Sequence, residues 1–565
     1  MAIHTFEVDL KTQLVEALPL EESRDARPHS GLVPTGNFDM KGFSLIRLEN
    51  EWIKLVLCPA LGGRILELVS KQDKGGLELP TQIKVTGGGA RGARCSDGVQ
   101  WFAVVADGAS SMGFREVSLM DDDEAPAVLI HDFDAKTQVA TYAKLELLPD
   151  AASVRISLRC TNRGLRDVPF TAGVQMPPIL SEISSRFAQG GAFRDPVSGG
   201  GLAVTGVEGT LVGVEMGQAW VWRPEDGPLR PHQVFTTTFD VSPFHTQFPV
   251  RAVGRGAIIA SDDAALEICS AHGHSEVIVQ IRDAQGDPFE ARTPLGPGKK
   301  FATTLAGNLA NPSLLSVRTA QEVLASTGQA AHPLPSIHGD PGAELNGIPA
   351  TWDAATLTHL AKGRDLGGAA RFALAAIAAS RKEWEEADAH LVEAINLNAE
   401  CELLWWFRAA ISRNRGDDAT EEDPNLLNAH YLSPMDPLLR AEAFLGMGMS
   451  LGAEPNPMLA ALHEYPDKVV EVACQYIRVG LHSDASRWID ESLRHAENFR
   501  LRLLHAWLLA THTRMEVEAA QHLAKISEAT VVAPLLSDPI EELALMQLCE
   551  RFPDLPILFT IARLC

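Results

Sequence analysis

Residues 48–68 read LENEWIKLVLCPALGGRILEL and indicate how the N-terminal half of the chain folds. Apolar and polar residues alternate up to Leu57, which is typical of a β-strand, and a second strand pattern begins at Arg64. The segment between them ends in Gly62 and Gly63, which permit a tight turn that larger residues cannot adopt. We therefore expect a strand pair whose second strand aims the Arg64 side chain at one end of a sheet.

The alternating pattern continues through most of the sequence before residue 340. Residues 134–164 (DAKTQVATYAKLELLPDAASVRISLRCTNRG) alternate in short apolar runs that turn residues interrupt. We expect a large antiparallel β domain over residues 41–310. Residues 1–40 mix prolines and charges, and they form either strands that wrap this domain or a partly ordered N-terminal arm.

The second half of the sequence has a helical pattern instead. Residues 369–380 (AARFALAAIAAS) place apolar side chains three and four positions apart, and strand formers are few. Before this half, residues 329–350 contain four prolines and three glycines, as an extended connector does. We expect a linker over residues 311–350 and an α-helical domain over residues 351–565.

Two segments of the helical half share one packing pattern. Residues 383–399 (EWEEADAHLVEAINLNA) resemble the second helix of a tetratricopeptide repeat, and residues 481–498 repeat the small, large and small positions. The offset between them is close to three repeats of ~34 residues, which predicts a short solenoid of stacked helix pairs. An irregular helical bundle remains the alternative. The repeated positions are Trp384, Ala387, Leu391 and Ala394, and then Ala485, Ile489 and Ser492.

The composition limits the class of partner. The 565 residues include 49 Lys and Arg against 73 Asp and Glu, a net charge of −24, which repels nucleic-acid phosphates and anionic lipid. The sequence shows no signal-peptide core at its start and no apolar run of the length that a membrane span needs. Its eight cysteines are scattered singly, which favours reduced thiols in a cytoplasmic protein. We expect no nucleic-acid or membrane partner, no metal and no cofactor.

Residues 48–68 also carry a family resemblance. Their Leu-Glu-Asn-Glu core, the following proline and the Gly-Gly-Arg-Ile segment resemble the N-terminal motif of a galactose-mutarotase-like family often fused to tetratricopeptide repeats. Weaker agreement follows in order at residues 142–162, 170–178, 294–301 and 430–445. The resemblance implies a large antiparallel β-supersandwich whose concave face binds a sugar, followed by an α-helical repeat domain.

The resemblance also implies a chemistry, from which this sequence departs. In active mutarotases a Glu removes the anomeric hydroxyl proton and a His donates to the ring oxygen, while related hydrolases use two carboxylates. Here Gln280 (in EVIVQIR) and Gln100 (in DGVQWF) stand where the family offers carboxylates. A glutamine hydrogen-bonds a hydroxyl group but cannot act as a base.

Other residues therefore become the candidates for the site. The candidate catalytic residues are Asp97, Glu182, Asp283 and Glu290. The candidate substrate-binding residues are Arg64, Gln100, Trp101, His245 and Gln280. An aromatic ring beside polar groups is a common way to hold a sugar. The structural alternatives are that Arg64 braces its turn, that Trp101 belongs to the core, and that His245 is an ordinary surface residue.

Two functions fit these observations. The first is a carbohydrate-active enzyme, either a glycoside hydrolase with acid–base catalysis or a sugar epimerase. For carboxylate hydrolysis it needs two inward titratable groups near Arg64, roughly 5–10 Å apart. The second is a non-catalytic sugar-binding protein whose helical repeats bind a protein partner or a second copy of the chain. The large size of the β domain favours the enzyme, because a simple binding module needs fewer residues.

Overall fold

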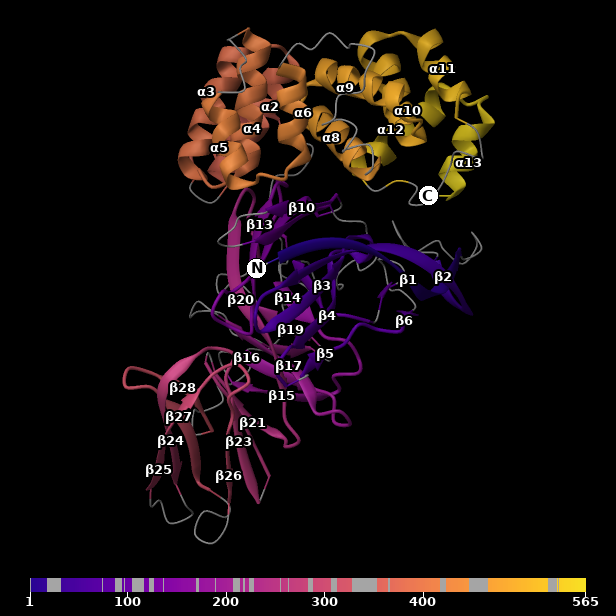
Figure 1. Ribbon diagram of the computed structural model, residues 1–565. Helices are drawn as coiled ribbons and strands as arrows, with labels where there is room; N and C mark the ends of the chain where they lie inside the picture. Colours follow the sequence, from indigo (N-terminus) through magenta and orange to yellow (C-terminus); the bar gives the residue numbers. More distant parts are fainter. Residues whose placement is uncertain are drawn as a thin grey trace.

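The computed structural model has a β part followed by a helical part, which confirms the fold class predicted from the sequence (Figure 1). Strands extend from Ala2 to Ser326, and helices from Ala354 to Leu564. The structure describes residues 2–17, 32–73, 75–86, 94–95, 97–103, 116–120, 126–135, 137–168, 172–187, 190–206, 214–216, 219–222, 228–254, 256–262, 264–282, 288–305, 312–327, 353–363, 366–416, 423–446, 466–526, 536 and 538–564.

The chain begins with a long β-hairpin. Strand β1 (Ala2–Ala17) pairs antiparallel with β2 (Leu32–Glu49) along almost its whole length. Figure 1 shows this hairpin extending sideways from the rest of the β part. The described residues within positions 1–40 therefore form strands.

The motif at residues 48–68 forms the expected strand pair next to this hairpin. Strand β3 (Ile53–Cys58) and strand β4 (Arg64–Ser70) are antiparallel, and the 3₁₀ turn η1 (Pro59–Leu61) joins them. The sheet has the order β5-β4-β3-β2-β1-β6. Its short strands are β5 (Gly76–Leu77) and β6 (Gln82–Ile83), with β7 (Val85–Thr86) and β8 (Arg94–Cys95) as a separate pair.

Two further sheets complete the first β unit. The larger has the order β10-β11-β12-β13-β20-β17-β16-β15 and the smaller β18-β19-β14-β9. Alternate residues of β12 and β13 are buried in their middle parts, as the alternating sequence predicts. The strands of the larger sheet are β10 (Glu116–Met120), β11 (Ala127–Asp134), β12 (Val139–Leu147), β13 (Val154–Asn162), β15 (Glu182–Phe187), β16 (Gly190–Arg194), β17 (Gly200–Gly206) and β20 (Val234–His245). Those of the smaller are β9 (Gln100–Ala103), β14 (Ala172–Gln175), β18 (Val214–Met216) and β19 (Ala219–Trp222).

A second, smaller β-sandwich follows, with its own hydrophobic core. Its sheets have the orders β21-β22-β23-β26 and β25-β24-β27-β28. Strands β27 and β28 lie within residues 311–350, where the sequence predicts a linker, because Leu315, Val317 and Leu324 complete this core. The strands are β21 (Val250–Val253), β22 (Ile258–Ser261), β23 (Ala265–Cys269), β24 (His274–Arg282), β25 (Pro288–Leu295), β26 (Phe301–Thr304), β27 (Leu314–Arg318) and β28 (Val323–Ser326).

The helical part is built from paired helices. The repeated positions Ala387, Leu391, Ala485, Ile489 and Ser492 are all fully buried, which is what stacked helix pairs require. The elements are α1 (Ala354–Leu360), α2 (Gly367–Ser380), α3 (Trp384–Leu397), α4 (Glu402–Arg415), α5 (Pro424–Leu432), α6 (Pro437–Gly446), α8 (Pro466–Arg478), α9 (His482–His495), α10 (Phe499–Leu508), the π-helical turn η3 (Leu509–Thr513), α11 (Glu516–Ala524), α12 (Pro539–Arg551) and α13 (Pro556–Leu564).

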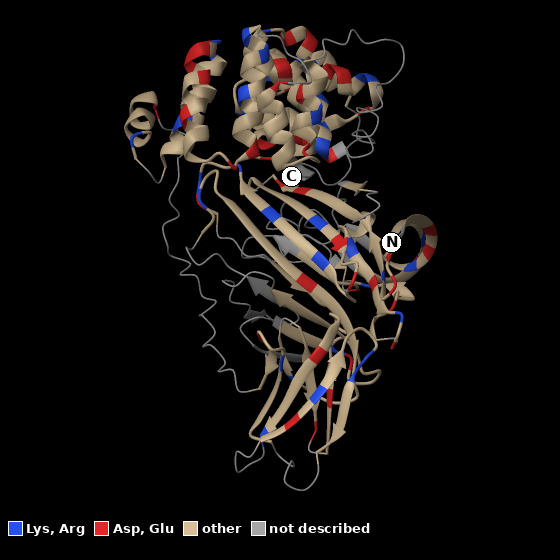
Figure 2. Cartoon of the chain, turned by 60° about the vertical axis from the view of Figure 1, so that its left-hand side comes forward, with Lys and Arg blue, Asp and Glu red and all other residues tan. Residues whose placement is uncertain are grey.

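Charged residues of both signs are interspersed along the strands and over the helices (Figure 2). Within the described ranges, every helix is too short or too polar to span a bilayer.

Candidate functional site

The Gly62–Gly63 turn places Arg64 at the first position of β4. Both glycines have positive φ angles, 73° and 67°, which residues with a Cβ rarely adopt. A Cβ on Gly63 would also lie 2.8 Å from Cδ1 of Ile130. The backbone conformation of the turn therefore favours glycine at both positions, and the close packing on β11 favours it at position 63 as well.

The Arg64 side chain is directed into the protein. It is 1% exposed, its Nη1 donates to the Asp97 carbonyl oxygen at 3.1 Å, and its Nη2 donates to Oε1 of Gln100. Gly98 has a φ of 80°, and a Cβ there would lie 2.9 Å from Cγ of Arg64. In this conformation Arg64 holds residues 97–100 against the start of β4, which corresponds to the bracing alternative.

The neighbours of Arg64 that we selected from the sequence are also largely enclosed. Gln100 and Trp101 are 0% and 1% exposed, and the Trp101 ring belongs to the core of the first β unit. Asp97 is half-buried, and its Oδ2 accepts a hydrogen bond from the backbone N–H of Lys84. The structure therefore brings Arg64 together with Asp97 and Gln100, and Trp101 follows Gln100 on the same strand, β9.

The other predicted site residues lie elsewhere. Gln280 is on β24 of the second sandwich, on the face opposite to the buried Val279, and its Nε2 donates to Oε1 of Glu290 at 3.2 Å. Glu290 is exposed on β25. His245 ends β20 and is half-buried, with its Nε2 at 3.3 Å from Nε2 of Gln247.

Two predicted catalytic side chains are outside the described part of the structure. Glu182 begins β15, but its side chain is not among those described. Asp283 lies outside the described residues altogether. Within the described residues, Arg64, Asp97, Gln100 and Trp101 therefore lie in one group, Gln280 and Glu290 form a second group on a sheet with a separate core, and His245 lies at the end of β20.

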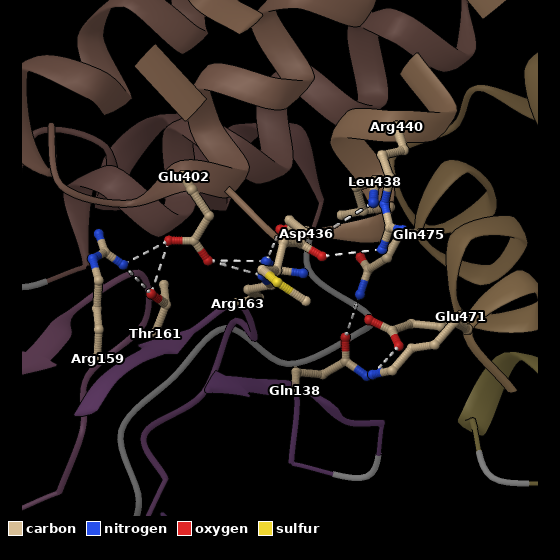
Figure 3. Close-up of polar contacts among 12 residues, drawn as sticks. Gln138, Arg159, Thr161, Arg163, Glu402, Asp436, Leu438, Arg440, Glu471 and Gln475 are labelled. Carbon is tan, nitrogen blue, oxygen red and sulfur yellow. Dashed lines mark hydrogen bonds and ion pairs between the residues drawn. The ribbon is translucent and has the colours of Figure 1, made fainter. Parts of the chain in front are cut away.

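A cluster of buried charges that sequence reasoning missed lies between the β part and the helical part (Figure 3). Arg163, which follows β13, has a fully buried side chain. Its Nε donates to Oε1 of Glu402 on α4 at 3.0 Å, and its Nη2 donates to Oδ2 of Asp436 before α6. Arg159 and Thr161 donate to the other oxygen of Glu402, Oε2, at 3.1 and 2.9 Å.

The electrostatics of this cluster are set by burial and by Arg163. Burial alone would raise the pKa of Glu402, but the attraction of Arg163 and Arg159 is stronger, and the pKa is lowered. Burial raises the pKa of the Asp436 carboxyl despite its contact with Arg163. Arg163 thus pairs with two buried carboxylates, and it stabilises the ionised form of Glu402 more than that of Asp436.

Helix α8 provides a second set of contacts at the same boundary. Gln475 Nε2 donates to Oε1 of Gln138 at 3.2 Å, and Lys468 Nζ lies 3.0 Å from Oε2 of Glu471. Burial raises the pKa of Glu471 to about 7, although Lys468 opposes this shift. Burial and the nearby cations lower the pKa of His131 on β11 well below its ordinary value, and its ring nitrogens have no hydrogen-bond partner among the described residues.

The sequence contained part of the signal for this cluster. Residues 142–162 end immediately before Arg163, and residues 430–445 contain Asp436. Both segments contribute to the family resemblance, but neither indicates that the two would meet. Perturbed ionisable groups mark functional sites and structural ion-pair networks alike. The burial and the pairing of Arg163 favour a structural role in joining the two parts of the chain.

The chain is similar to several solved structures. No protein-family model and no curated protein matches the chain. A TPR-domain containing protein from Parabacteroides distasonis aligns with 94% of this chain and 92% of its own, at 12% identity and a TM-score of 0.34. A galactose mutarotase-like protein from Clostridium acetobutylicum aligns with 36% of this chain and 96% of its own, at 8% identity and a TM-score of 0.25. A 4-alpha-glucanotransferase from Thermococcus litoralis aligns with 41% of this chain and 39% of its own, at 10% identity and a TM-score of 0.25. At such low TM-scores these similarities bear on neither substrate nor mechanism.

Proposed function

We propose that this protein binds a sugar without converting it, and that its helical repeats form a partner platform fixed to the β part. The family resemblance of residues 48–68 supports a sugar as the ligand. The absence of conversion is supported by one observation above all. Arg64 turns its guanidinium onto Gln100 and the Asp97 carbonyl, and both acceptors are neutral groups of its own chain.

The positions of Asp97 and Glu290, the two predicted catalytic residues whose side chains the structure describes, agree with this proposal. Acid–base catalysis requires two titratable groups that face one substrate, and carboxylate hydrolysis needs them within about 10 Å. Asp97 belongs to the first β unit and uses an oxygen to accept the Lys84 N–H. Glu290 lies on the exposed face of the second sandwich, bonded to Gln280. These two carboxylates therefore belong to separate surfaces.

The buried charges around Arg163 support the second half of the proposal. A helical domain on a flexible tether would meet the β part through exposed and exchangeable contacts. Here Glu402 and Asp436 share one buried guanidinium from the β part. Separating the two parts would leave these charges unpaired, so a partner on the helices is held in a fixed orientation to the β part.

The test is a thermal-shift screen of the full chain against mono- and disaccharides. A ligand at 100 times its Kd stabilises the folded state by ~2.7 kcal/mol, which is measurable as a rise in Tm. Sugars also stabilise proteins as osmolytes, so the shift must saturate with concentration to count as binding. The same samples are assayed for released reducing sugar and for change of optical rotation.

We expect a saturable shift with at least one sugar and no turnover. Turnover of a sugar that binds would overturn the non-catalytic assignment and favour the enzyme. The lack of a saturable shift across the whole panel would refute the proposal that the protein binds a sugar.

A further inference from the structure

A cavity of 780 Å³ lies in the helical part, and neither Glu402 nor Asp436 is among its lining residues. Residues of α9 make up most of its lining, and residues from the C-terminal end of α2 and from the π-helical turn η3 also line it. Ser483, Arg487, Asp490 and Arg494 follow one another along α9 at spacings of three or four residues. Cavities of roughly 300–1,000 Å³ are the usual size for small-molecule ligands.

One part of the lining has an uncommon backbone. Residues Leu509–Thr513 form the π-helical turn η3, and π-helical turns are rare and frequent at functional sites. This turn stacks the His512 ring on the His482 ring, with centroids 3.7 Å apart and an angle of 23° between the planes. Burial lowers the pKa of His482 to about 4 and also lowers that of His512. Near pH 7 both rings are neutral, so each offers one donor and one acceptor nitrogen.

The charged groups of the cavity give it a positive excess on an acidic protein. Three of the lining residues are the cations Lys382, Arg487 and Arg494, and two are the acids Asp490 and Glu491. Glu491 is buried and already bonds Arg494 at 3.1 Å and His495 at 3.2 Å. The lining therefore carries one more cation than acids, whereas the whole chain carries a net charge of −24.

We propose that this cavity binds a small phosphate ester that also carries hydroxyl groups, such as a hexose phosphate. Arg487 and Lys382 contact the phosphate oxygens, assisted by serine hydroxyls of the cavity wall. Asp490 and the neutral imidazoles of His482 and His512 exchange hydrogen bonds with the hydroxyl groups. This site is separate from the sugar-binding proposal for the β part and does not depend on it.

Isothermal titration of the full chain tests the ligand chemistry with four probes. The probes are glucose 6-phosphate, inorganic phosphate, glucuronate and glucose. We expect glucose 6-phosphate to bind at least tenfold more tightly than each of the other three. Equal binding of inorganic phosphate would refute the role of the hydroxyl groups, and equal binding of glucuronate would refute the preference for phosphate. No binding of glucose 6-phosphate would overturn the proposal.

Two variants and a matched control test the location. R487Q and K382G each remove one cation of the cavity, and glycine suits position 382 because Lys382 has a φ of 64°. We expect each to weaken glucose 6-phosphate binding at least tenfold, with helical circular dichroism unchanged. R381Q removes the adjacent exposed charge, which does not line the cavity, and should leave binding unchanged. Equal losses in R381Q and R487Q would show general charge attraction and overturn the site. Any glucose binding by the β part should not respond to R487Q, which separates the two proposals.

Discussion

The guanidinium of Arg163 bonds directly to the carboxylate of Asp436, although 273 residues separate them in the chain. Arg163 follows β13 of the first β unit, and Asp436 precedes α6 of the helical part. Both are buried, and Glu402 shares the same guanidinium. The net stability from such a cluster is small, because desolvation opposes the attraction, but loss of one member leaves an uncompensated buried charge.

We therefore predict that R163M destabilises the chain by about 3–5 kcal/mol, the usual cost of breaking a buried ion pair. Glu402 and Asp436 would remain buried without their principal cation. Urea unfolding followed by far-ultraviolet circular dichroism measures this change. Because the contact joins the β and helical parts, we also expect these two parts to unfold further apart in urea concentration in R163M than in the wild type.

R166M is the matched control for this variant. Arg166 lies three positions later in the same segment and is exposed. Its replacement should change the unfolding free energy by less than about 0.5 kcal/mol. Similar losses in R163M and R166M would show that the effect belongs to the loop and not to the ion pair.

The buried Glu471 predicts a pH dependence of stability. Burial raises its pKa from 4.5 to about 7, so the folded state favours the protonated carboxyl. The stability this group provides is complete below its unfolded pKa and is lost as the pH rises through about 7. Between pH 5 and pH 8, the wild type should therefore lose stability relative to E471Q, by an amount on the order of 3 kcal/mol.

Comparison with a second amide variant isolates this effect. Asp436 has a raised pKa and His131 a lowered one, but both remain in wild type and variant, so their contributions largely cancel in the difference. E385Q removes an exposed carboxylate on α3 and should keep the wild-type pH dependence. If E471Q and wild type follow parallel curves, Glu471 is not the titrating group.

The sequence predicted what depends on local periodicity. The hairpin at residues 48–68 and the helical positions of Ala387 and Leu391 follow from spacing, because burial on one face imposes a period on the chain. The division of the β part into two units could not be read in this way. Strands of one sandwich and of the next have the same alternation, and only their cores distinguish them.

The candidate site was harder to predict because it also depends on contacts between residues that are distant in sequence. The turn at Gly63 is a local feature, and it does place Arg64 at the start of a strand. The direction of the Arg64 guanidinium depends on Gln100, which is distant in sequence. The bracing role of Arg64 depends on the same contact. The meeting of Arg163 with Asp436 depends on the packing of whole domains, about which neither local segment carries information.

The left-handed turn before Arg64 predicts a sharp difference between two glycines. G63A should destabilise the chain by roughly 1–2 kcal/mol, since an L-residue is strained at a φ of 67° and its Cβ would meet Ile130. A Cβ on Gly36 of β2 would meet no atom of the other described residues within 4 Å, so G36A should leave stability unchanged or slightly raised. Thermal unfolding of both variants checks this. Equal loss in the two would show that the conformation of the turn is not the cause.

The position of Gln280 predicts the effect of restoring a carboxylate there. Gln280 lies directly opposite Glu290 in the β24–β25 register, and its amide donates to that carboxylate. Q280E would place like charges across the pair and destabilise the second sandwich by about 0.2–1 kcal/mol, whereas Q280K should stabilise it by a similar amount. Thermal unfolding at low and high salt measures both effects, which salt should reduce because the pair is exposed. Since this face is separate from the surroundings of Arg64, we expect Q280E to show neither hydrolysis nor epimerisation of any sugar that the wild type binds. Sugar-converting activity that arises only in Q280E would place the site on the second sandwich and would identify the chain as the descendant of an enzyme that lost one carboxylate.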